Sequence, residues 1–161
     1  MKMITLVFLS VLTLFAGEYD FKEERYVYSI DKMLTMKGKI AFDDKGMKID
    51  YVEPEVRHIS YDGLYMDVID SSGKNIQHVD LNEQPMMKVY LDFIHKLYRG
   101  DYEALSENFT IHKTTTVVIL TPIAPVDKVI KSVVVQRSAK GLEKIMTKMS
   151  NGDEITLFIA Q

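Results

Sequence analysis

The sequence predicts an α+β domain in which one helix covers a mostly antiparallel sheet. Between the turns, apolar and polar residues alternate with a period of two, which is typical of strands with one buried face. One stretch near the middle of the chain has helical spacing instead, and the short connections favour antiparallel neighbours. The turns themselves are marked by glycine-containing pairs: Lys45-Gly46, Asp62-Gly63, Ser72-Gly73, Lys140-Gly141 and Asn151-Gly152.

Alternation is clearest over Leu34–Phe42, where the even positions form an apolar face. That face comprises Leu34, Met36, Gly38, Ile40 and Phe42. Two more alternating sets predict inner faces: Met47, Ile49 and Tyr51, and Leu64, Met66 and Val68. Further strands are expected around Tyr26, Tyr28 and Ile30, and over Thr115–Leu120, Val129–Gln136, Leu142–Met149 and Ile155–Ala160.

The helical stretch begins after Gln84 and ends at Gly100. Pro85 suits the first helical position, where no N–H is needed, and glycine commonly follows the end of a helix. Asp101 can cap a short second helix over Tyr102–Ser106. Apolar residues of the first helix form two neighbouring stripes: Met86, Tyr90, Phe93 and Leu97, and Met87, Leu91, Ile94 and Tyr98. Such a wide apolar face is the expected cover for a sheet that is apolar on one side.

Residues 1–16, MKMITLVFLSVLTLFA, have the pattern of a secretory signal peptide. Lys2 supplies the charged start, Ile4–Phe15 the apolar stretch, and Ala16 and Gly17 a small-residue exit. An apolar run of about 12 residues is too short to cross a hydrocarbon core of about 30 Å as a helix. The sequence therefore predicts export and a single mature domain over residues 17–161, with a helical insertion at about 84–107.

Composition excludes several classes of protein. Lys and Arg number 20 against 23 Asp and Glu, so the net charge is −3, whereas a general nucleic-acid binder needs a basic excess to neutralise phosphates. The chain has no cysteine, which excludes disulfides, a thiol nucleophile and Cys-ligated metal sites. With 47% apolar residues, the chain can bury a core and does not belong to the disordered class.

A search for chemistry in the sequence finds no catalytic, metal or cofactor motif. The histidines are not at ligand spacing, and we expect them at the surface, solvated or hydrogen-bonded: His58, His78, His95 and His112. Two pairs of adjacent carboxylates occur, Glu23-Glu24 and Asp43-Asp44. Adjacent residues on a strand point to opposite faces, so neither pair is expected to share a substrate.

Methionine is abundant, and eight of the 10 methionines remain after Met1 and Met3 leave with the signal peptide. Several fall on the predicted inner faces, where their flexible thioether side chains adapt to irregular contents. Two interpretations stay open on these residues alone. In the first, methionine only fills the core between sheet and helix. In the second, the two layers do not close and the gap holds acyl chains, each buried methylene contributing about 0.8 kcal/mol.

The stretch Gly38–Leu81 resembles the periplasmic outer-membrane lipoprotein carrier (LolA-like) family. The similar pieces read KGKIAF, then MKIDYVEP, then HISYDGLYMDVIDSSGKNIQHVDL, with the family's spacing from Pro54 to Asp62-Gly63. In the second half, an apolar strand closes with Leu120-Thr121-Pro122. The segment IKSVVVQRSAKGLEKIMTKMSNGDEITLFI then resembles the family's closing meander.

This resemblance implies an incomplete antiparallel β-barrel, or half-barrel, with a helical plug or lid on its concave face. It also implies a monomeric carrier in the periplasm, which takes acylated lipoproteins or another lipid from an inner-membrane ABC transporter to an outer-membrane receptor. Two features depart from the family. The family's lid-closing Arg falls at Asp43, and its long first helix is missing because Phe21 follows the signal peptide almost at once.

The carrier interpretation predicts that apolar side chains of the sheet and the helix bind acyl chains, with no catalytic residue, metal or cofactor. The expected lining comprises Met36, Ile40, Phe42, Met47, Ile49, Tyr51, Leu64, Met66 and Val68 from the sheet, and Met86, Tyr90, Phe93, Ile94 and Leu97 from the helix. One alternative is an envelope protein-interaction or sensing module with a solid core on the same fold. A hydrolase is a further alternative, although no nucleophile–base pair is recognisable.

Overall fold

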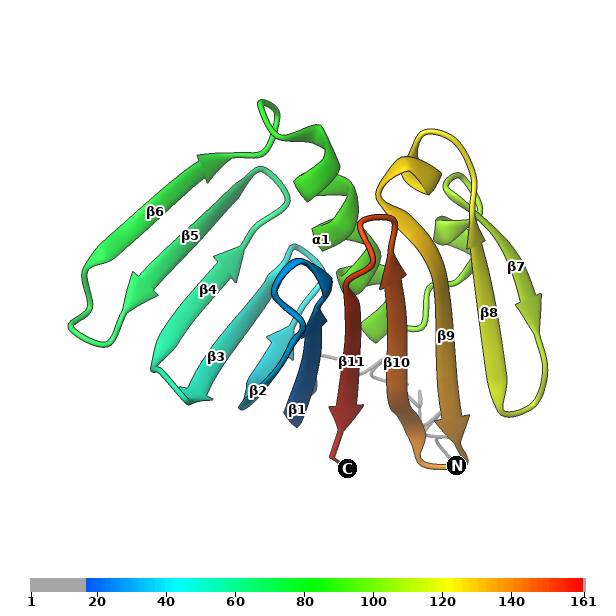
Figure 1. Cartoon of the computed structure of the whole chain (residues 1–161), viewed down its shortest axis with the longest axis horizontal. Helices are drawn as coiled ribbons and strands as arrows, with labels where there is room; N and C mark the ends of the chain where they lie inside the picture. Colours follow the sequence, from blue (N-terminus) through cyan, green and yellow to red (C-terminus); the bar gives the residue numbers. More distant parts are fainter. Residues whose placement is uncertain (1–16, 161) are drawn as a thin grey trace, which may run out of the picture.

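The computed structural model describes residues 17–160, and one sheet holds all the strands in this range. The strands are β1 (Gly17–Val27), β2 (Lys32–Phe42), β3 (Met47–Glu53), β4 (Arg57–Tyr61), β5 (Tyr65–Asp70), β6 (Asn75–Asp80), β7 (Phe109–Lys113), β8 (Val117–Pro122), β9 (Ile130–Ser138), β10 (Gly141–Met149) and β11 (Glu154–Ile159). Their order across the sheet is β6-β5-β4-β3-β2-β1-β11-β10-β9-β8-β7 (Figure 1). The edge strands β6 and β7 do not pair with each other, so the sheet is open.

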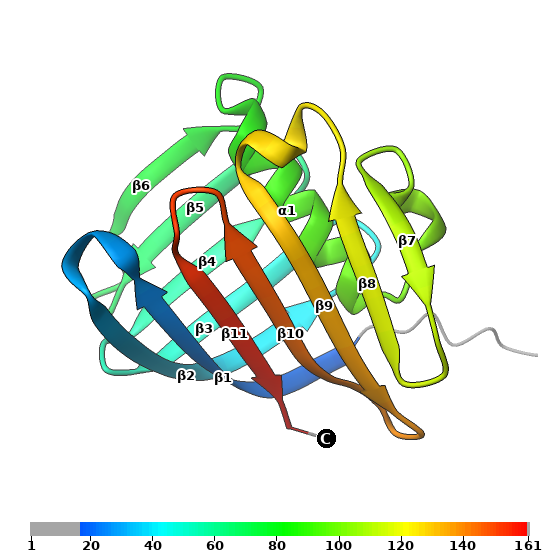
Figure 2. The same ribbon diagram turned by 45° about the vertical axis from the view of Figure 1, so that its right-hand side comes forward.

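The sheet curls around the helix α1 (Pro85–Tyr98), which lies on its concave side (Figure 2). Part of the bend arises where β2 pairs with β3: the register shifts between Lys37 and Gly38, and the extra residue, Val52, lies on β3. Bulges bend a strand and increase its twist. Glycine is needed at this point, because a Cβ on Gly38 would lie 2.2 Å from the carbonyl oxygen of Asp50. The structure thus confirms the coarser part of the expectation, an unclosed antiparallel sheet with one helix.

Helix α1 follows the prediction closely. Pro85 lies in its first turn, and Gly100 follows its end in a left-handed conformation with φ of +71°. The short second helix is a 3₁₀ turn, η2 (Glu103–Leu105), and the carboxylate of Asp101 accepts a hydrogen bond from the N–H of Ala104 at 3.3 Å. Within residues 17–160, no helix is both long and apolar enough to cross a membrane.

The half of the sheet formed by β7–β10 packs solidly against α1, and we call this region the solid half. Phe93 of α1 packs into it, with the rings of Phe93 and Phe109 5.2 Å apart between centroids, and Leu97, one turn further along α1, is fully buried and does not line the cavity described below. Its other members are almost completely buried: Leu105, Val118, Leu120, Val126, Ile130, Val133, Val135 and Ile145. These side chains are mostly branched and aliphatic, and they are almost completely buried. Their close packing therefore fixes α1 to β7–β10.

The opposite side of the sheet, β3–β6 (residues 47–80), is called the wing. Its inner face buries Met47, Tyr61, Met66 and Val68, but much of its remaining surface is exposed. Edge strand β6 carries polar side chains on both faces, so alternation does not predict it. Carboxylates hold the turns of the wing: Asp62 accepts hydrogen bonds from the N–H groups of Leu64 and Tyr65 at 2.8 and 2.7 Å.

Four apolar residues were expected on strands or inner faces and are exposed instead; one of them is Leu34, which is 43% exposed near the start of β2. Tyr28 and Ile30 lie in a 3₁₀ turn, η1 (Tyr28–Ile30), which joins β1 to β2 and projects beyond the cover of α1; their exposed fractions are 63% and 57%. Leu64 is 51% exposed because it belongs to the Asp62 turn that precedes β5, outside the alternation of Met66 and Val68. The predicted signal peptide, residues 1–16, lies outside the described residues.

Truncating a buried side chain of the solid half should strongly lower the free energy of unfolding. Ile145→Ala is expected to lower the free energy of unfolding by about 2–5 kcal/mol, because Ile145 is fully buried and the surrounding residues cannot collapse into the space. Ile119→Ala on β8 is the control: its side chain is 40% exposed, and the loss should stay near 0.5 kcal/mol. Urea unfolding followed by circular dichroism measures both, and equal losses would contradict the solid packing.

Acid should loosen the wing before the solid half. Hydrogen bonds from Tyr65 and Leu64 lower the pKa of Asp62, those from His78 and Asn75 lower the pKa of Asp67, and those from Ser72 and Lys74 lower the pKa of Asp70. A carboxyl with a lowered folded pKa stabilises the fold above its unfolded value, and this contribution is lost as the pH falls through the folded pKa.

Hydrogen-exchange protection factors should therefore fall in β4–β6 as the pH drops from about 5 toward 3. Protection in β9 and β10 serves as the internal control and should change later. Simultaneous loss of protection in both regions would show that these aspartates do not act on the wing in particular.

Candidate functional site

A cavity of about 150 Å³ lies between the concave face of the sheet and α1. It is lined by Phe21, Glu23, Arg25, Ile40, Met47, Ile49, Tyr51, Ile59, Met66, Tyr90, Leu91, Ile94, Tyr98 and Leu157. A second hollow of about 210 Å³ shares Arg25, Tyr51 and Ile59 with it and is otherwise formed by Met36, Glu53, Pro54, Glu55 and Arg57. The shared residues therefore form a neck between an inner, apolar space and an outer space with charged walls.

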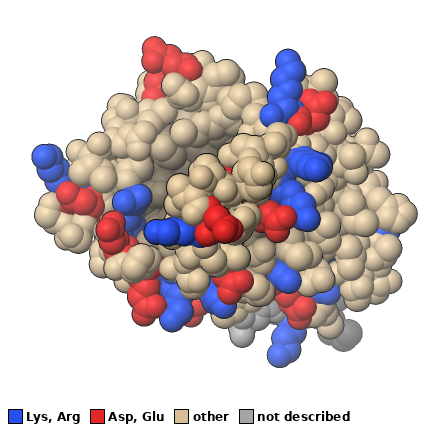
Figure 3. Space-filling model, in the orientation of Figure 1, with Lys and Arg blue, Asp and Glu red and all other residues tan. Residues whose placement is uncertain are grey.

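The molecular surface is visibly hollowed on the face shown in Figure 3. The hollow lies between the strands on the left of the view and the centre of the molecule, and its walls are mostly uncharged. Charged side chains of both signs gather along its lower rim. An apolar interior with a charged rim is the usual character of a site that takes an apolar ligand from water.

The structure brings part of the predicted lining together. The expected residues that line the cavity are Ile40, Met47, Ile49, Tyr51, Met66, Tyr90 and Ile94, and Met36 lines the outer hollow. Val68, Phe93 and Leu97 are buried in the core and do not line the cavity, and Met86 is half-buried outside it. Phe42 is also buried, but it lines a separate hollow of about 450 Å³ beside the β2–β3 turn. The exposed Leu64 corrects the prediction that it lies on the inner face. The binding of acyl chains by these residues stays a prediction.

Sequence reasoning missed the contribution of β1 to the cavity. Phe21, Glu23 and Arg25 alternate along β1 and all line the cavity. The two charged residues hid this face, because a strand with Glu and Arg on its inner side does not show apolar alternation. Leu157 of β11 joins them because β1 pairs with β11 at the centre of the sheet, a long-range pairing that local pattern does not reveal.

A charge network occupies the neck, with the Glu23 carboxylate buried and the Arg25 side chain 40% exposed. Glu23 is only 4% exposed, and one of its oxygens accepts a hydrogen bond from Nε of Arg25 at 3.1 Å and forms an ion pair with Nη2 at 2.8 Å. Its other oxygen accepts a hydrogen bond from the Tyr51 hydroxyl at 3.1 Å. Burial and the nearby Glu23 raise the pKa of Tyr51. Both carboxylate oxygens are thus satisfied and the opposite charges cancel, which is the condition for a buried ion pair to be tolerated.

Helix α1 adds two tyrosines to the same cavity. Tyr98 is 8% exposed, and its hydroxyl has no hydrogen-bond partner. Among the residues that the structure describes, no hydrogen bond is formed by the Tyr90 hydroxyl either. Burial raises the pKa of Tyr90 to about 12 and also raises the pKa of Tyr98, to which the charge of Glu23 contributes. Both hydroxyls therefore stay protonated at neutral pH and remain hydrogen-bond donors.

Three polar contacts join α1 to the wing and its neighbouring turn, and we call this set the clasp. The Tyr61 hydroxyl donates to the carboxylate of Asp92. Nε2 of His95 lies 2.6 Å from the carbonyl oxygen of Asp43, and Nη2 of Arg99 lies 2.6 Å from a carboxylate oxygen of Asp44. The clasp thus lies between α1 and the region around the β2–β3 turn.

Two sequence predictions are tested by the clasp. His95 was expected at the surface, but it is buried at 9% exposure because its ring faces the sheet and reaches the β2–β3 turn. Asp43 and Asp44 form an exposed turn as expected, and the Asp43 carboxylate accepts hydrogen bonds from the N–H groups of Lys45 and Gly46. The resemblance aligns Asp43 with the family's lid-closing Arg. In this chain the backbone carbonyl of Asp43, and not its side chain, contacts the helix.

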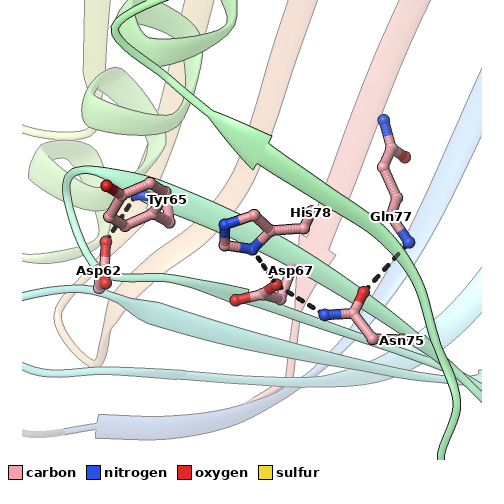
Figure 4. A network of polar contacts seen from close by, with 6 residues as sticks. All are labelled: Asp62, Tyr65, Asp67, Asn75, Gln77 and His78. Atoms are coloured by element: carbon pink, nitrogen blue, oxygen red, sulfur yellow. Dashed lines mark hydrogen bonds and ion pairs between the residues drawn. The ribbon is translucent and has the colours of Figure 1, made fainter.

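The opposite face of the wing carries polar pairs (Figure 4). Nδ1 of His78 lies 2.6 Å from a carboxylate oxygen of Asp67, which also accepts a hydrogen bond from Asn75 at 2.8 Å. The Tyr65 ring stacks on the His78 ring with 5.1 Å between centroids. These contacts tie edge strand β6 to β5. Within residues 17–160, no Ser or Thr hydroxyl is hydrogen-bonded to a histidine ring, and no group of three metal-ligating side chains occurs.

Comparison with known proteins adds little beyond the fold. Scans against protein families and against curated proteins found no match. Among solved structures, the chain is similar to a domain from Vibrio parahaemolyticus given the provisional description of an outer membrane lipoprotein-sorting protein. The identity is 10% and the TM-score 0.42, and the match covers 90% of this chain and 84% of that chain. A similarity of this degree carries no information about function, which must be inferred from the cavity.

Proposed function

We propose that this chain is a non-enzymatic carrier that shields acyl chains from water in the cavity between the sheet and α1. The observation that carries the proposal is the cavity itself, with apolar walls contributed by six strands and the helix and with a neck that leads to the surface. The walls include Ile40, Met47, Met66 and Ile94, whose flexible or branched side chains adapt to hydrocarbon. Transfer of each methylene from water is favourable by about 0.8 kcal/mol.

The volume of the cavity indicates that the structure represents a closed state of the proposed carrier. An engineered apolar cavity of about 150 Å³ holds benzene, whereas pockets for larger ligands occupy about 300–1,000 Å³. The inner space of about 150 Å³ therefore accommodates a short hydrocarbon segment, and a long acyl chain requires the cavity to widen. A carrier must release its cargo, so a closed state that opens reversibly suits this function.

The packing of α1 favours movement of the wing over movement of the helix. Phe93 and Leu97 fix α1 in the solid half. The wing is joined to α1 by the clasp and by cavity-lining side chains that touch open space on one side, such as Ile49 and Ile59. Regions with fewer buried apolar contacts open at lower free energy. We therefore assign uptake and release to separation of the wing from α1.

The cargo and partners follow from the sequence resemblance over Gly38–Leu81. On that basis, the cargo is an acylated lipoprotein or another lipid, carried by a monomer through the periplasm from an inner-membrane ABC transporter to an outer-membrane receptor. The fully packed solid half supports one alternative, a protein-interaction or sensing module in which the small cavity is incidental. Binding measurements separate the two.

The proposal is tested by native mass spectrometry of the mature protein purified from an envelope, together with titration by the fluorescent probe N-phenylnaphthylamine. A carrier should retain acyl lipid and should bind the probe in a form that lipids displace. Recovery of lipid-free protein alone, with no displaceable probe, would contradict carriage and favour the interaction module.

Filling the cavity should abolish binding while the fold is kept. Ile49 and Ile59 are cross-strand partners and both line the cavity. The double change Ile49→Phe and Ile59→Phe places two rings in the open space, so we expect probe affinity to fall at least about tenfold with an unchanged melting temperature. Ile111→Phe on β7 is the matched control outside the cavity. Unchanged affinity in the double variant would show that ligands bind elsewhere.

Weakening the clasp should speed uptake. Tyr61→Phe combined with Arg99→Ala removes two of its three contacts, so stopped-flow uptake of the probe should become several-fold faster. Unfolding free energy should fall by about 2 kcal/mol, since one lost bond involves a carboxylate and the other an exposed ion pair. The control pair is Tyr102→Phe with Arg137→Ala, which contact each other away from the cavity. Reduced stability without faster uptake would rule out the clasp as the gate.

A further inference from the structure

We infer that the cavity takes acyl compounds whose polar end is an ester or amide carbonyl, held by the hydroxyls of Tyr98 and Tyr90 beside the Glu23–Arg25–Tyr51 network. This inference rests on the proposed function, because it names the class of acyl compound that the cavity carries. The inference depends on polar side chains, which a cavity that binds only hydrocarbon would not need. They lie in the cavity wall together with aliphatic side chains.

The Tyr98 hydroxyl lacks a partner from its own chain. Its side chain is nine-tenths buried, it lines the cavity, and its oxygen forms no hydrogen bond. Buried polar groups are almost always hydrogen-bonded, because an unsatisfied one loses its interaction with water without replacement. The Tyr98 ring is held against Phe42 with 5.6 Å between centroids. A ligand in the cavity can supply the missing acceptor.

The chemistry of the available groups favours a neutral acceptor. Glu23 and Arg25 neutralise each other, and both carboxylate oxygens of Glu23 are already occupied by Arg25 and Tyr51. No uncompensated positive charge is therefore left for an anionic head group. A free carboxylate would also lie close to the charge of Glu23 in a buried site, which is unfavourable. Hydroxyl donors such as Tyr98 match a carbonyl oxygen, which only accepts.

The position of the network orients the ligand. Arg25 and Tyr51 line both the inner cavity and the outer hollow, so they form the neck between them. Ile40, Met47 and Met66 line the inner cavity and do not line the outer hollow. A hydrocarbon tail thus belongs inside, with its carbonyl at the level of the tyrosine hydroxyls and the rest of the cargo toward the outer hollow.

The test compares three competitors of equal chain length for displacement of N-phenylnaphthylamine at neutral pH: decane, methyl decanoate and decanoate. We expect methyl decanoate to displace the probe at a concentration about five- to tenfold lower than decane, the value of one hydrogen bond in a water-poor site. Decanoate should displace the probe only at a higher concentration than methyl decanoate, although it also has a polar end. Tighter binding of decanoate than of the ester would overturn the inference.

The matched variant is Tyr98→Phe, which removes only the hydroxyl, with Tyr102→Phe as a control outside the cavity. Tyr98→Phe should abolish the preference for ester over decane, and its melting temperature should stay the same or rise, because an unsatisfied buried hydroxyl is removed. A hydroxyl with a purely structural role would instead lower the melting temperature and leave the preference intact. That result would overturn the inference.

The outcomes separate this inference from the proposed function. Failure of the wild-type protein to bind the probe or any competitor contradicts carriage itself. Equal displacement by decane and methyl decanoate leaves carriage standing and removes the carbonyl subsite. Loss of the ester preference in Tyr98→Phe alone, with Tyr102→Phe like the wild type, supports both.

Discussion

Most of this architecture depends on how the two faces of one amphipathic helix are buried. Phe93 and Leu97 anchor α1 in the tightly packed solid half, while Ile94 and Tyr98 on the neighbouring face border open space. A helix held on one side needs no second set of close contacts to stay in place. The facing strands can therefore remain less well packed, and this asymmetry gives the molecule a stable frame and a deformable wall.

The polar clasp compensates for the looser packing of the wing. Two of its contacts lie at the C-terminal end of α1, where His95 reaches the Asp43 carbonyl and Arg99 pairs with Asp44. Hydrogen bonds and exposed ion pairs contribute about 1 kcal/mol each, much less than a buried apolar cluster. A wall held in this way separates from the helix at modest cost and returns to the same position, because the directional contacts define one closed arrangement.

Local pattern predicted the parts of the fold that bury one face. Alternation located β2 and β3, and Pro85 and Gly100 bounded α1 correctly. It failed at Tyr28 and Ile30, because periodicity cannot show where a hairpin extends past the cover of its helix. The cavity was only partly predictable for a related reason. Glu23 interrupts the apolar pattern of β1 and becomes satisfied only through Arg25 and the distant Tyr51, a pairing set by tertiary structure.

The charge network also explains why the cavity is not closed by collapse. A purely apolar gap between β3–β6 and α1 could disappear if the wing moved inward, since nothing would oppose burial of more apolar surface. Arg25 opposes it, because its side chain is still 40% exposed and full removal from solvent adds a desolvation penalty that its existing contacts with Glu23 cannot offset further. The network therefore holds the sheet away from the helix at the neck. The space behind it stays open to hydrocarbon because the polar groups that border it resist being covered.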